Sequence, residues 1–356
     1  MNFLVTEDRT LTYKDLIDQI NKGSSDNFFS SFVAGMVSND LIDLSCYRFN
    51  QSKNNITDID DLRNRIVNSQ SVLVLKTSGT TGTPKIKTHK ISSLLKNTKP
   101  MSTKNNWLFT YNNKHMGGTQ VLLQALVNLD CINDVYRRDR EYILKQVEGA
   151  NISHISATPT FYRMLLPFNK SYDNVQRVTI GGERSDVETI SFIRKIFPKA
   201  KINNIYATTE TGALLFSSSD VFTINDRVFV DGTLKVKLDD GSVHDTGDLV
   251  QMISDTDFVF CGRNTNIINV GGNNVNPIEV EDVIKSHCNV KDAVVYGRPN
   301  KLLGNVLTCD VVLLEETTKN DLREHIRNGI AENYKIPRII KIKDSLEVSD
   351  TNKVIR

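Results

Sequence analysis

Three short runs in this sequence, each with apolar or β-branched residues, lead into loops that contain adjacent glycines or threonines. The runs cover residues 71–75, 178–180 and 202–206. Their length and composition predict buried strands, and stretches with helical periodicity lie between the first two of them. Repeated strand and helix units predict an α/β fold with a mainly parallel sheet, in which ligands gather at the carboxyl ends of the strands. We therefore expect the three loops to carry the chemistry.

The pattern changes after residue 221. Short alternating runs follow, with Asp-Gly pairs at 231–232 and 240–241 that are typical of β-hairpins. Beyond residue 262, helical and strand patterns mix again. We predict a large α/β domain over residues 1–262, in which a small antiparallel β portion accompanies the parallel sheet, and a smaller, mobile α+β domain over residues 263–356.

Composition limits the classes of partner. Lys and Arg number 44 against 42 Asp and Glu, and a net charge of +2 gives no reason to expect a surface that binds nucleic acid. No run approaches the roughly 18 apolar residues of a membrane span, and the early Glu7 and Asp8 argue against a secretory signal. Five scattered cysteines without CxxC spacing indicate neither a disulfide framework nor a zinc site. We expect a cytoplasmic protein with a small-molecule partner, and its oligomeric state stays open.

The strongest local signal is the loop after the first predicted strand, Thr77-Ser78-Gly79-Thr80-Thr81-Gly82-Thr83-Pro84-Lys85. Such a loop exposes backbone N–H groups and hydroxyl donors to phosphate oxygens, its glycines permit close approach of the backbone, and Lys85 adds positive charge. The residue order of a Walker A loop is absent. We predict a phosphate site of another kind, with these contacts: Thr77, Ser78, Gly79, Thr80, Thr81, Gly82 and Lys85.

This string resembles the phosphate-binding signature of the ANL superfamily of adenylate-forming enzymes, which includes acyl-CoA and aryl-CoA ligases. Further motifs appear downstream in the family's order, so the resemblance covers roughly residues 71–356. It implies ATP-dependent activation of a carboxylic acid to an acyl-adenylate, with release of pyrophosphate. It also implies Mg²⁺ as the ion that accompanies ATP and CoA as the acceptor in a second, thioester-forming half-reaction.

The second and third loops resemble the adenine-side motifs of the family. Gly181-Gly182-Glu183 is similar to the loop along adenine, which implies Gly182 and Glu183 as ATP contacts. Residues 204–210 are similar to the family's Tyr-Gly-x-Thr-Glu element, with Ala207 in place of glycine. By their chemistry, Tyr206 offers a flat face to a purine, Thr209 a hydroxyl to phosphate, and Glu210 an oxygen ligand to Mg²⁺. The resemblance adds Asn204 to the nucleotide contacts and assigns Thr209 and Glu210 to catalysis.

Two motifs beyond residue 240 extend the resemblance. Thr246-Gly247-Asp248 resembles the family's Thr-Gly-Asp, whose carboxylate accepts hydrogen bonds from ribose hydroxyls. Gly262-Arg263 resembles the Gly-Arg at the hinge between domains, so Asp248 and Arg263 are implied as ATP contacts. Gly271 and Gly272 resemble the glycine loop that faces the thiol.

The C-terminal motif completes the series. Residues 349–356 resemble the family's Thr-x-x-Gly-Lys-x-x-Arg, which implies Lys353 as the lysine that drives adenylation. Asn352 stands in place of the glycine, an exchange compatible with a left-handed backbone. Thr265 and Asn269 replace the usual hinge Asp and the Lys before the glycines.

His115 and Gly118 lie where acyl-CoA and aryl-CoA ligases carry a His-x-x-Gly segment beside the acyl pocket, which implies an acyl-pocket role for both. His115 is equally compatible with a core histidine that faces a backbone carbonyl. Amino-acid-activating relatives place an Asp in this region, and none occurs between residues 111 and 124. The resemblance therefore implies an acid without an α-amine. The His-Met-Gly-Gly context at residues 115–118 resembles that of o-succinylbenzoate-CoA ligases. Gln124 stands where a cation would be expected for the second carboxylate of that acid, so the acid itself stays open.

Two alternatives to a CoA ligase remain at this point. One is an adenylation enzyme that loads the phosphopantetheine of a carrier protein, and the other is a nucleotide-binding protein that keeps the fold without turnover. The family also has a longer stretch before its phosphate loop than this chain has before Thr77. We therefore expect an abridged N-terminal region, which affects the acyl-pocket wall or a dimer surface.

Overall fold

The protein is described by a computed structural model covering residues 1–46, 49, 52–77, 85–96, 98–208, 212–238, 240–350 and 353–356. The chain forms two compact units. The first unit contains residues 1–156 and 172–178, and the second contains residues 157–171 and 179–356. Each unit is described by itself.

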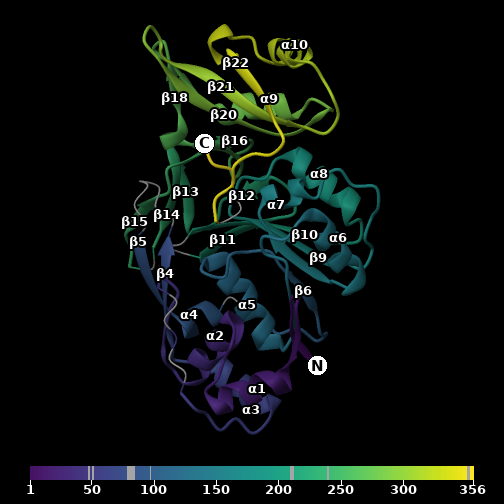
Figure 1. Ribbon diagram of the computed structural model, residues 1–356. Helices are drawn as coiled ribbons and strands as arrows, with labels where there is room; N and C mark the ends of the chain where they lie inside the picture. Colours follow the sequence, from purple (N-terminus) through teal and green to yellow (C-terminus); the bar gives the residue numbers. More distant parts are fainter. Residues whose placement is uncertain are drawn as a thin grey trace. The chain divides into compact units, whose positions relative to one another are not determined.

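The first unit is built on a mainly parallel sheet (Figure 1) with the strand order β8-β6-β7-β1-β2. These strands are β8 (His154–Ala157), β6 (Asn106–Phe109), β7 (Cys131–Asp134), β1 (Asn2–Val5) and β2 (Thr10–Thr12). Only β2 runs antiparallel, at the edge beside β1. Helix α5 (Met116–Asn128) connects β6 to β7, and α6 (Arg140–Gly149) connects β7 to β8. The predicted α/β organisation is therefore confirmed.

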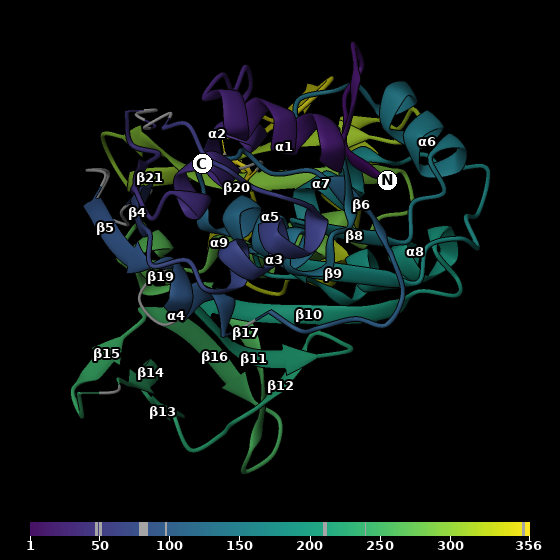
Figure 2. The ribbon, with the colours of Figure 1, turned by 90° about the horizontal axis from the view of Figure 1, so that it is seen from below.

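Helices α1 (Tyr13–Lys22), α2 (Phe28–Val37) and α3 (Ile59–Val67) contact one another, and α3 contacts α5 (Figure 2). The side chains of Leu16 and Ile20 on α1, and of Leu62 and Ile66 on α3, are buried at helical spacing. Helix α2 is apolar on nearly all sides and is accordingly buried on all sides. This helical layer closes the apolar core of the unit.

A second, smaller sheet of the first unit carries the ends of the predicted phosphate loop. It contains β3 (Leu41–Asp43), β4 (Val72–Thr77) and β5 (Lys85–Lys90), and α4 (Ile91–Leu95) follows. The strand predicted over residues 71–75 is thus confirmed. Strands β4 and β5 are antiparallel, with Thr77 opposite Lys85. The predicted contacts Ser78, Gly79, Thr80, Thr81 and Gly82 lie outside the described residues.

The second unit begins with short helices and strands. Its elements here are α7 (Pro159–Met164), the end of β9 (Arg177–Gly181), α8 (Val187–Ile196), β10 (Lys201–Thr208) and β11 (Gly212–Ser217). The strand order is β11-β10-β9, and β10 and β11 are antiparallel. The strands predicted before the second and third loops are therefore present.

The predicted antiparallel portion is confirmed as two small sheets. One contains β12 (Val221–Thr223), β17 (Asp257–Arg263) and β16 (Asp248–Met252), and the other contains β13 (Val228–Asp231), β14 (Thr233–Lys237) and β15 (Val243–Asp245). Gly232 has a φ of 70° between β13 and β14, and Gly241 has a φ of 84° between β14 and β15. Both predicted Asp-Gly pairs therefore provide the left-handed residue that such a turn uses.

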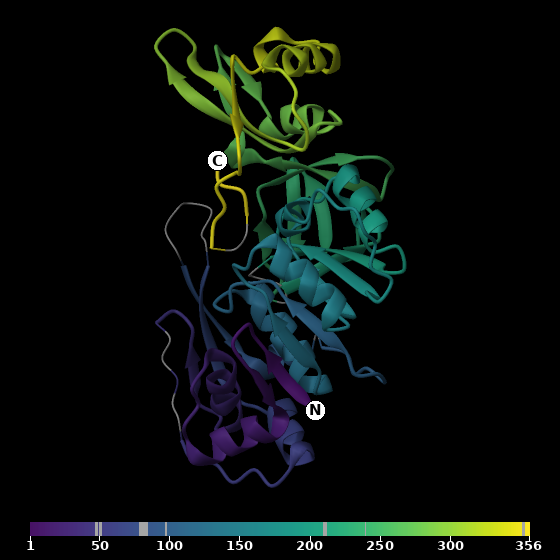
Figure 3. The ribbon, with the colours of Figure 1, turned by 45° about the vertical axis from the view of Figure 1, so that its right-hand side comes forward.

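The last part of the second unit is an α+β arrangement (Figure 3). Its elements are two 3₁₀ turns (Asn264–Asn266, Asn333–Lys335), β18 (Ile268–Val270), β19 (Asn273–Val275), α9 (Pro277–Lys285), β20 (Val290–Asn300), β21 (Gly304–Leu313), α10 (Lys319–Gly329) and β22 (Ile339–Lys343). Side chains of α9 and α10 pack with those of the β20-β21-β22 sheet in one apolar cluster. Across the described residues of both units, no helix combines the length and apolar character of a membrane span.

Candidate active site

A buried carboxylate forms the centre of the candidate site in the second unit. Asp248 is the first residue of β16 and pairs across the sheet with Arg263, the last residue of β17. Its Oδ1 accepts a hydrogen bond from Arg263 Nε at 2.8 Å, and its Oδ2 accepts one from the Tyr206 hydroxyl at 2.6 Å. The Asp248 carboxylate is therefore fixed in orientation. Because a carboxylate has about four acceptor positions, it can still receive hydroxyl donors.

The Tyr206 ring is held on one face and at its hydroxyl. It stacks on Phe260 with the ring centres 4.6 Å apart and the planes 28° apart. Burial raises the pKa of Tyr206, and the nearby charge of Asp248 raises it further. The side chain therefore remains a phenol that donates to Asp248. A ring fixed in this way can present its other face to a flat base such as a purine.

Lys353 lies beside this group. Its Cε would be 3.6 Å from a Cβ placed on Gly182, a loop glycine with a φ of 85° that directly follows β9. Burial lowers the pKa of Lys353, the carboxylates of Glu183 and Asp248 oppose that shift, and the charge of Arg263 adds to it. The structure therefore brings together five predicted site residues: Gly182, Tyr206, Asp248, Arg263 and Lys353.

This arrangement suits the recognition of a nucleotide that carries phosphates. Two cationic side chains, Lys353 and Arg263, lie near a carboxylate whose remaining acceptor positions suit ribose hydroxyls. The partial burial of Lys353 strengthens any electrostatic interaction that its ammonium makes. The Tyr206–Asp248 bond joins residues 42 positions apart, and no sequence pattern had indicated it.

The side chains of two other predicted ATP contacts are engaged within the protein. Glu183 accepts hydrogen bonds from the backbone N–H groups of Thr160 and Val354 at 3.1 and 3.2 Å. Asn204 is buried, and its amide donates to the carbonyl of Ser219 at 2.8 Å. Their contacts with ATP stay predictions, while these side chains already link segments of the second unit. Thr209 and Glu210 lie outside the described residues.

The predicted thiol-side glycines form the turn between β18 and β19. Gly271 and Gly272 are exposed and have φ values of 59° and 87°. The N–H of Gly272 donates to Asn269 Oδ1 at 3.1 Å, so the residue that replaces the family's lysine shapes this turn. The role of this turn toward a thiol stays a prediction.

The predicted acyl-pocket residues belong to the first unit. His115 is half-buried at the N-cap position of α5. A Cβ on Gly118 would lie 2.8 Å from the carbonyl oxygen of Asn112 and 3.2 Å from the Phe109 ring. Gly118 is therefore required for the first turn of α5 to pack against the segment after β6. Contact of either residue with an acid stays a prediction.

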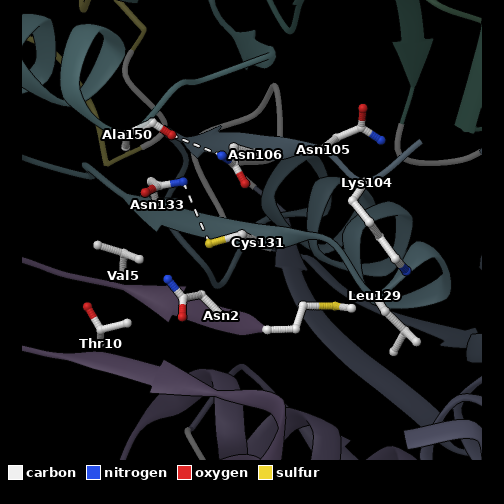
Figure 4. A pocket seen from close by; sticks show the side chains of 11 residues that line it. Asn2, Val5, Thr10, Lys104, Asn105, Asn106, Leu129, Cys131, Asn133 and Ala150 are labelled. Atoms are coloured by element: carbon white, nitrogen blue, oxygen red, sulfur yellow. Dashed lines mark hydrogen bonds between the residues drawn. The ribbon is translucent and has the colours of Figure 1, made fainter.

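The first unit also contains a cavity of about 370 Å³ (Figure 4). Asn2, Asn106 and Cys131 line it, and these residues begin the parallel strands β1, β6 and β7. Ligands of α/β sheets bind at the opposite, carboxyl ends of the strands. This cavity is therefore not favoured as the active site.

Comparison with protein families identifies the chain. The model of the AMP-binding enzyme family matches residues 32–239. The chain belongs to the AMP-binding enzyme family. The model of the AMP-binding enzyme C-terminal domain matches residues 279–353, which include Lys353. The resemblance to adenylate-forming enzymes is thus confirmed.

Curated relatives of this AMP-binding enzyme are named 2-succinylbenzoate–CoA ligases. The one from Listeria monocytogenes serotype 4b (strain F2365) is 25% identical, and the match covers 81% of this chain and 69% of the relative. The one from Staphylococcus aureus (strain JH9) is 24% identical over 80% of this chain. That match spans 65% of the length of the Staphylococcus protein.

Solved structures share the fold of this AMP-binding enzyme. The o-succinylbenzoate CoA synthetase from Bacillus subtilis, in complex with the acyl-adenylate intermediate OSB-AMP, matches with a TM-score of 0.68 at 18% identity. ATP-bound MatB from Rhodopseudomonas palustris matches with a TM-score of 0.68 at 14% identity. Both matches cover 99% of this chain and 94% of the other. The predicted fold class is therefore confirmed.

Proposed function

We propose that this AMP-binding enzyme activates a carboxylic acid with ATP to an acyl-adenylate and then transfers the acyl group to the thiol of CoA. The observation that carries the proposal is the convergence of Lys353, Arg263, Tyr206 and Asp248 in the second unit. The CoA-ligase names of the curated relatives agree with this reaction class.

In the first half-reaction, a carboxylate oxygen of the acid attacks the α-phosphorus of ATP. The bond from that phosphorus to the bridging oxygen breaks, and pyrophosphate leaves. Two anions must approach each other, so the transition state needs positive charge in a fixed place. Lys353 is the catalytic residue in this proposal, because its partly buried ammonium would offset the charge that develops on phosphate.

In the same proposal Asp248 accepts the ribose hydroxyls, and Tyr206 stacks against adenine with Gly182 and Glu183 in the adjoining loop. Arg263 holds the Asp248 carboxylate in its orientation. The phosphate loop after β4 and the residues Asn204 and Thr209 complete the nucleotide contacts as predictions.

The ATP is proposed to bind with Mg²⁺, whose charge would neutralise phosphate oxygens. The proposed protein ligand is Glu210. No group of three or more His, Cys, Asp or Glu side chains within the described ranges could hold a metal ion by itself. This fits an ion that arrives with the nucleotide and keeps most of its ligands from phosphate and water.

In the second half-reaction, the thiolate of CoA attacks the acyl carbon of the adenylate, a thioester forms, and AMP leaves. We propose that the turn at Gly271 and Gly272 faces this thiol. We also retain the domain boundary between residues 262 and 263, which falls between the two family matches at residues 32–239 and 279–353. A cytoplasmic location likewise stays a proposal from the sequence.

The acid is proposed to lack an α-amine, and its identity is left to experiment. The curated relatives act on 2-succinylbenzoate, which has a second carboxylate. In this chain the Gln124 amide accepts from the N–H of Lys99 at 2.9 Å and donates to its carbonyl at 2.7 Å. Gln124, which stands where a cation was expected, is therefore engaged with the backbone. A dicarboxylic acid is thus only one of the acid classes to be tested.

The test is acid-dependent pyrophosphate release with ATP and Mg²⁺, using aryl, fatty and dicarboxylic acids and hydroxylamine to trap the adenylate. Lys353→Ala is run beside Lys343→Ala, a matched control at an exposed lysine that ends β22. Release with one acid class that is lost only in Lys353→Ala supports the proposal. Thioester assays with CoA and with a carrier protein then decide the acceptor. ATP binding without release for any acid would instead indicate a nucleotide-binding protein without turnover.

A further inference from the structure

The segment that carries Lys353 is shaped by backbone bonds within it, and its last residue, Arg356, pairs with the buried Glu281 on α9 at 2.9 Å. Residues 347–349 run antiparallel to residues 353–355 (Figure 3), with a bridge between Val348 and Val354. The N–H of Ser349 donates to the carbonyl of Lys353 at 2.8 Å, and the N–H of Ile355 donates to the carbonyl of Glu347 at 2.9 Å. These bonds fix the shape of the C-terminal segment. They do not by themselves fix where the segment lies.

One side chain ties this segment to the part of the unit that contains β9 and α7. The Oε1 of Glu183 accepts the N–H of Val354, the residue after Lys353, at 3.2 Å. Its Oε2 accepts the N–H of Thr160 in the first turn of α7 at 3.1 Å. The carboxylate therefore bridges two backbone donors that are far apart in sequence, and each oxygen serves one of them.

A carboxylate suits this bridge better than an amide does. Both oxygens of a carboxylate accept hydrogen bonds, whereas a glutamine offers one oxygen and an NH₂ group. With Gln at position 183, the NH₂ group would face one of the two N–H donors. That donor would lose its partner, and the link between Val354 and Thr160 would be broken at one end.

The same carboxylate also acts on Lys353 through its charge. Among the described residues, the charges of Glu183 after β9, Asp248 on β16 and Arg263 on β17 act on the Lys353 ammonium and shift its pKa. The two oxygens of Asp248 already accept bonds from Tyr206 and Arg263. Glu183 accepts bonds from two neutral backbone N–H groups, and the charge of Arg163 also acts on it.

We propose that Glu183 is the positioning residue of Lys353, because its carboxylate holds the C-terminal segment through the Val354 N–H. This assignment rests on the proposed function and deepens it, because it gives Glu183 a role in the adenylation half-reaction that its likeness to an adenine-loop residue did not suggest. Because Lys353 is proposed to act in adenylation, the bridge should affect adenylation and not thioester formation.

The test compares Glu183→Gln with Glu188→Gln, an exposed glutamate in the first turn of α8. Pyrophosphate release should fall about 10- to 100-fold in Glu183→Gln, because a small displacement of a reacting group has an effect of this size. The loss should lie mainly in kcat, with a smaller change in KM. Thioester formation from a supplied acyl-adenylate and CoA should stay unchanged. Glu188→Gln should match the wild type in both assays.

Two further measurements need no turnover. Competitive chemical labelling of Lys353 as a function of pH should show a lower pKa in Glu183→Gln than in the wild type, because a negative charge that raises this pKa is lost. Hydrogen exchange in the peptide of residues 347–356 should become faster. Circular dichroism of both variants checks that the fold is intact.

The outcomes separate this inference from the proposed function. Labelling and exchange that are the same in Glu183→Gln and Glu188→Gln would overturn the positioning role, whatever the enzyme turns over. If labelling and exchange change in Glu183→Gln but the wild type releases no pyrophosphate with any acid, the contact is supported and the proposed adenylation reaction is rejected. Equal losses in both half-reactions would also overturn the proposal, because they would indicate general damage to the site.

Discussion

In the second unit, residues 268–340 are packed internally by apolar contacts, whereas charged contacts join them to α7 and α8. Within residues 268–340, side chains such as Ile284, Val295 and Leu322 form a closed apolar cluster between α9, α10 and the β20–β22 sheet. The same segment meets α7 and α8 through charged groups. Arg163 on α7 pairs with Asp292 on β20 at 2.9 Å, and Lys285 on α9 pairs with Asp186, the N-cap of α8, at 2.6 Å.

The apolar cluster and the ion pairs differ in how much they contribute to stability. Apolar burial is non-directional and additive in area, so the cluster stabilises residues 268–340 as one body. A buried ion pair contributes little net stability, because desolvation of both charges offsets their attraction. Burial raises the pKa of Asp186, but Lys285 and Arg163 lower it more, so the carboxylate stays charged at neutral pH. We infer that the charged contact determines where the segment lies more than how stable it is.

The largest expected effect concerns Lys353, the lysine proposed to act in adenylation. Lys353→Ala should reduce acid-dependent pyrophosphate release about 100- to 1000-fold, or about 3 to 4 kcal/mol in the barrier, because one preorganised cation is lost. Urea unfolding should be the same for Lys353→Ala, Lys343→Ala and the wild type. A lower free energy of unfolding in Lys353→Ala alone would contradict this comparison, because Lys353 would then stabilise the fold.

The next effect concerns the apolar cluster. Leu322→Ala should lower the free energy of unfolding by about 3 kcal/mol, since it removes a fully buried side chain and leaves a cavity. Leu302→Ala is the matched control, because Leu302 is 93% exposed. Denaturant unfolding followed by circular dichroism measures both. A loss below about 1 kcal/mol at Leu322 would show that the cluster does not hold these residues together.

A buried histidine that lies near a positive charge extends this contrast. His154 in the first unit packs against Trp107, with ring centres 4.8 Å apart. Burial and, to a smaller extent, the charge of Arg177 lower its pKa from 6.5 to about 4. The unfolded chain therefore takes up a proton as the pH falls through 6.5, while the folded protein does so only near 4. Stability is lost within that window, by about 2 kcal/mol at pH 5 relative to neutral pH.

Urea unfolding at pH 7 and pH 5 measures this loss. His154→Phe keeps an aromatic ring beside Trp107 and removes the titrating group. We expect the difference between the two pH values to shrink by about 2 kcal/mol in this variant. An unchanged difference would assign the acid sensitivity to other groups.

The smallest expected effect is that of exchanging an ion pair for neutral groups. Asn at position 186 still caps α8, and Met at position 285 keeps the volume of Lys. The double variant Asp186→Asn, Lys285→Met should therefore unfold within about 1 kcal/mol of the wild type. Each single variant should be less stable than the double, since it leaves one buried charge unpaired. A double variant as unstable as Leu322→Ala would show that the charged contact stabilises as strongly as the apolar cluster.

Much of the fold was predictable from short stretches of sequence. The β4, β9 and β10 strands and the turns at Gly232 and Gly241 follow from alternation, from β-branched residues and from glycine at left-handed positions. Helix α2 was not predicted, because its short apolar stretch lacks the periodicity that marks an amphipathic helix. Its burial on all sides depends on the neighbouring helices α1 and α3.

The motif order alone placed Asp248, Arg263 and Lys353 among the candidate site residues, because each belongs to a short string with its own chemistry. Only the tertiary structure decided what these residues contact. The Glu183–Val354 bond spans 171 positions, and the Lys285–Asp186 pair spans 99. Local strings set turns, strands and caps through neighbours in the chain. Contacts over such separations depend on topology and on the balance between burial and charge, which no local pattern records.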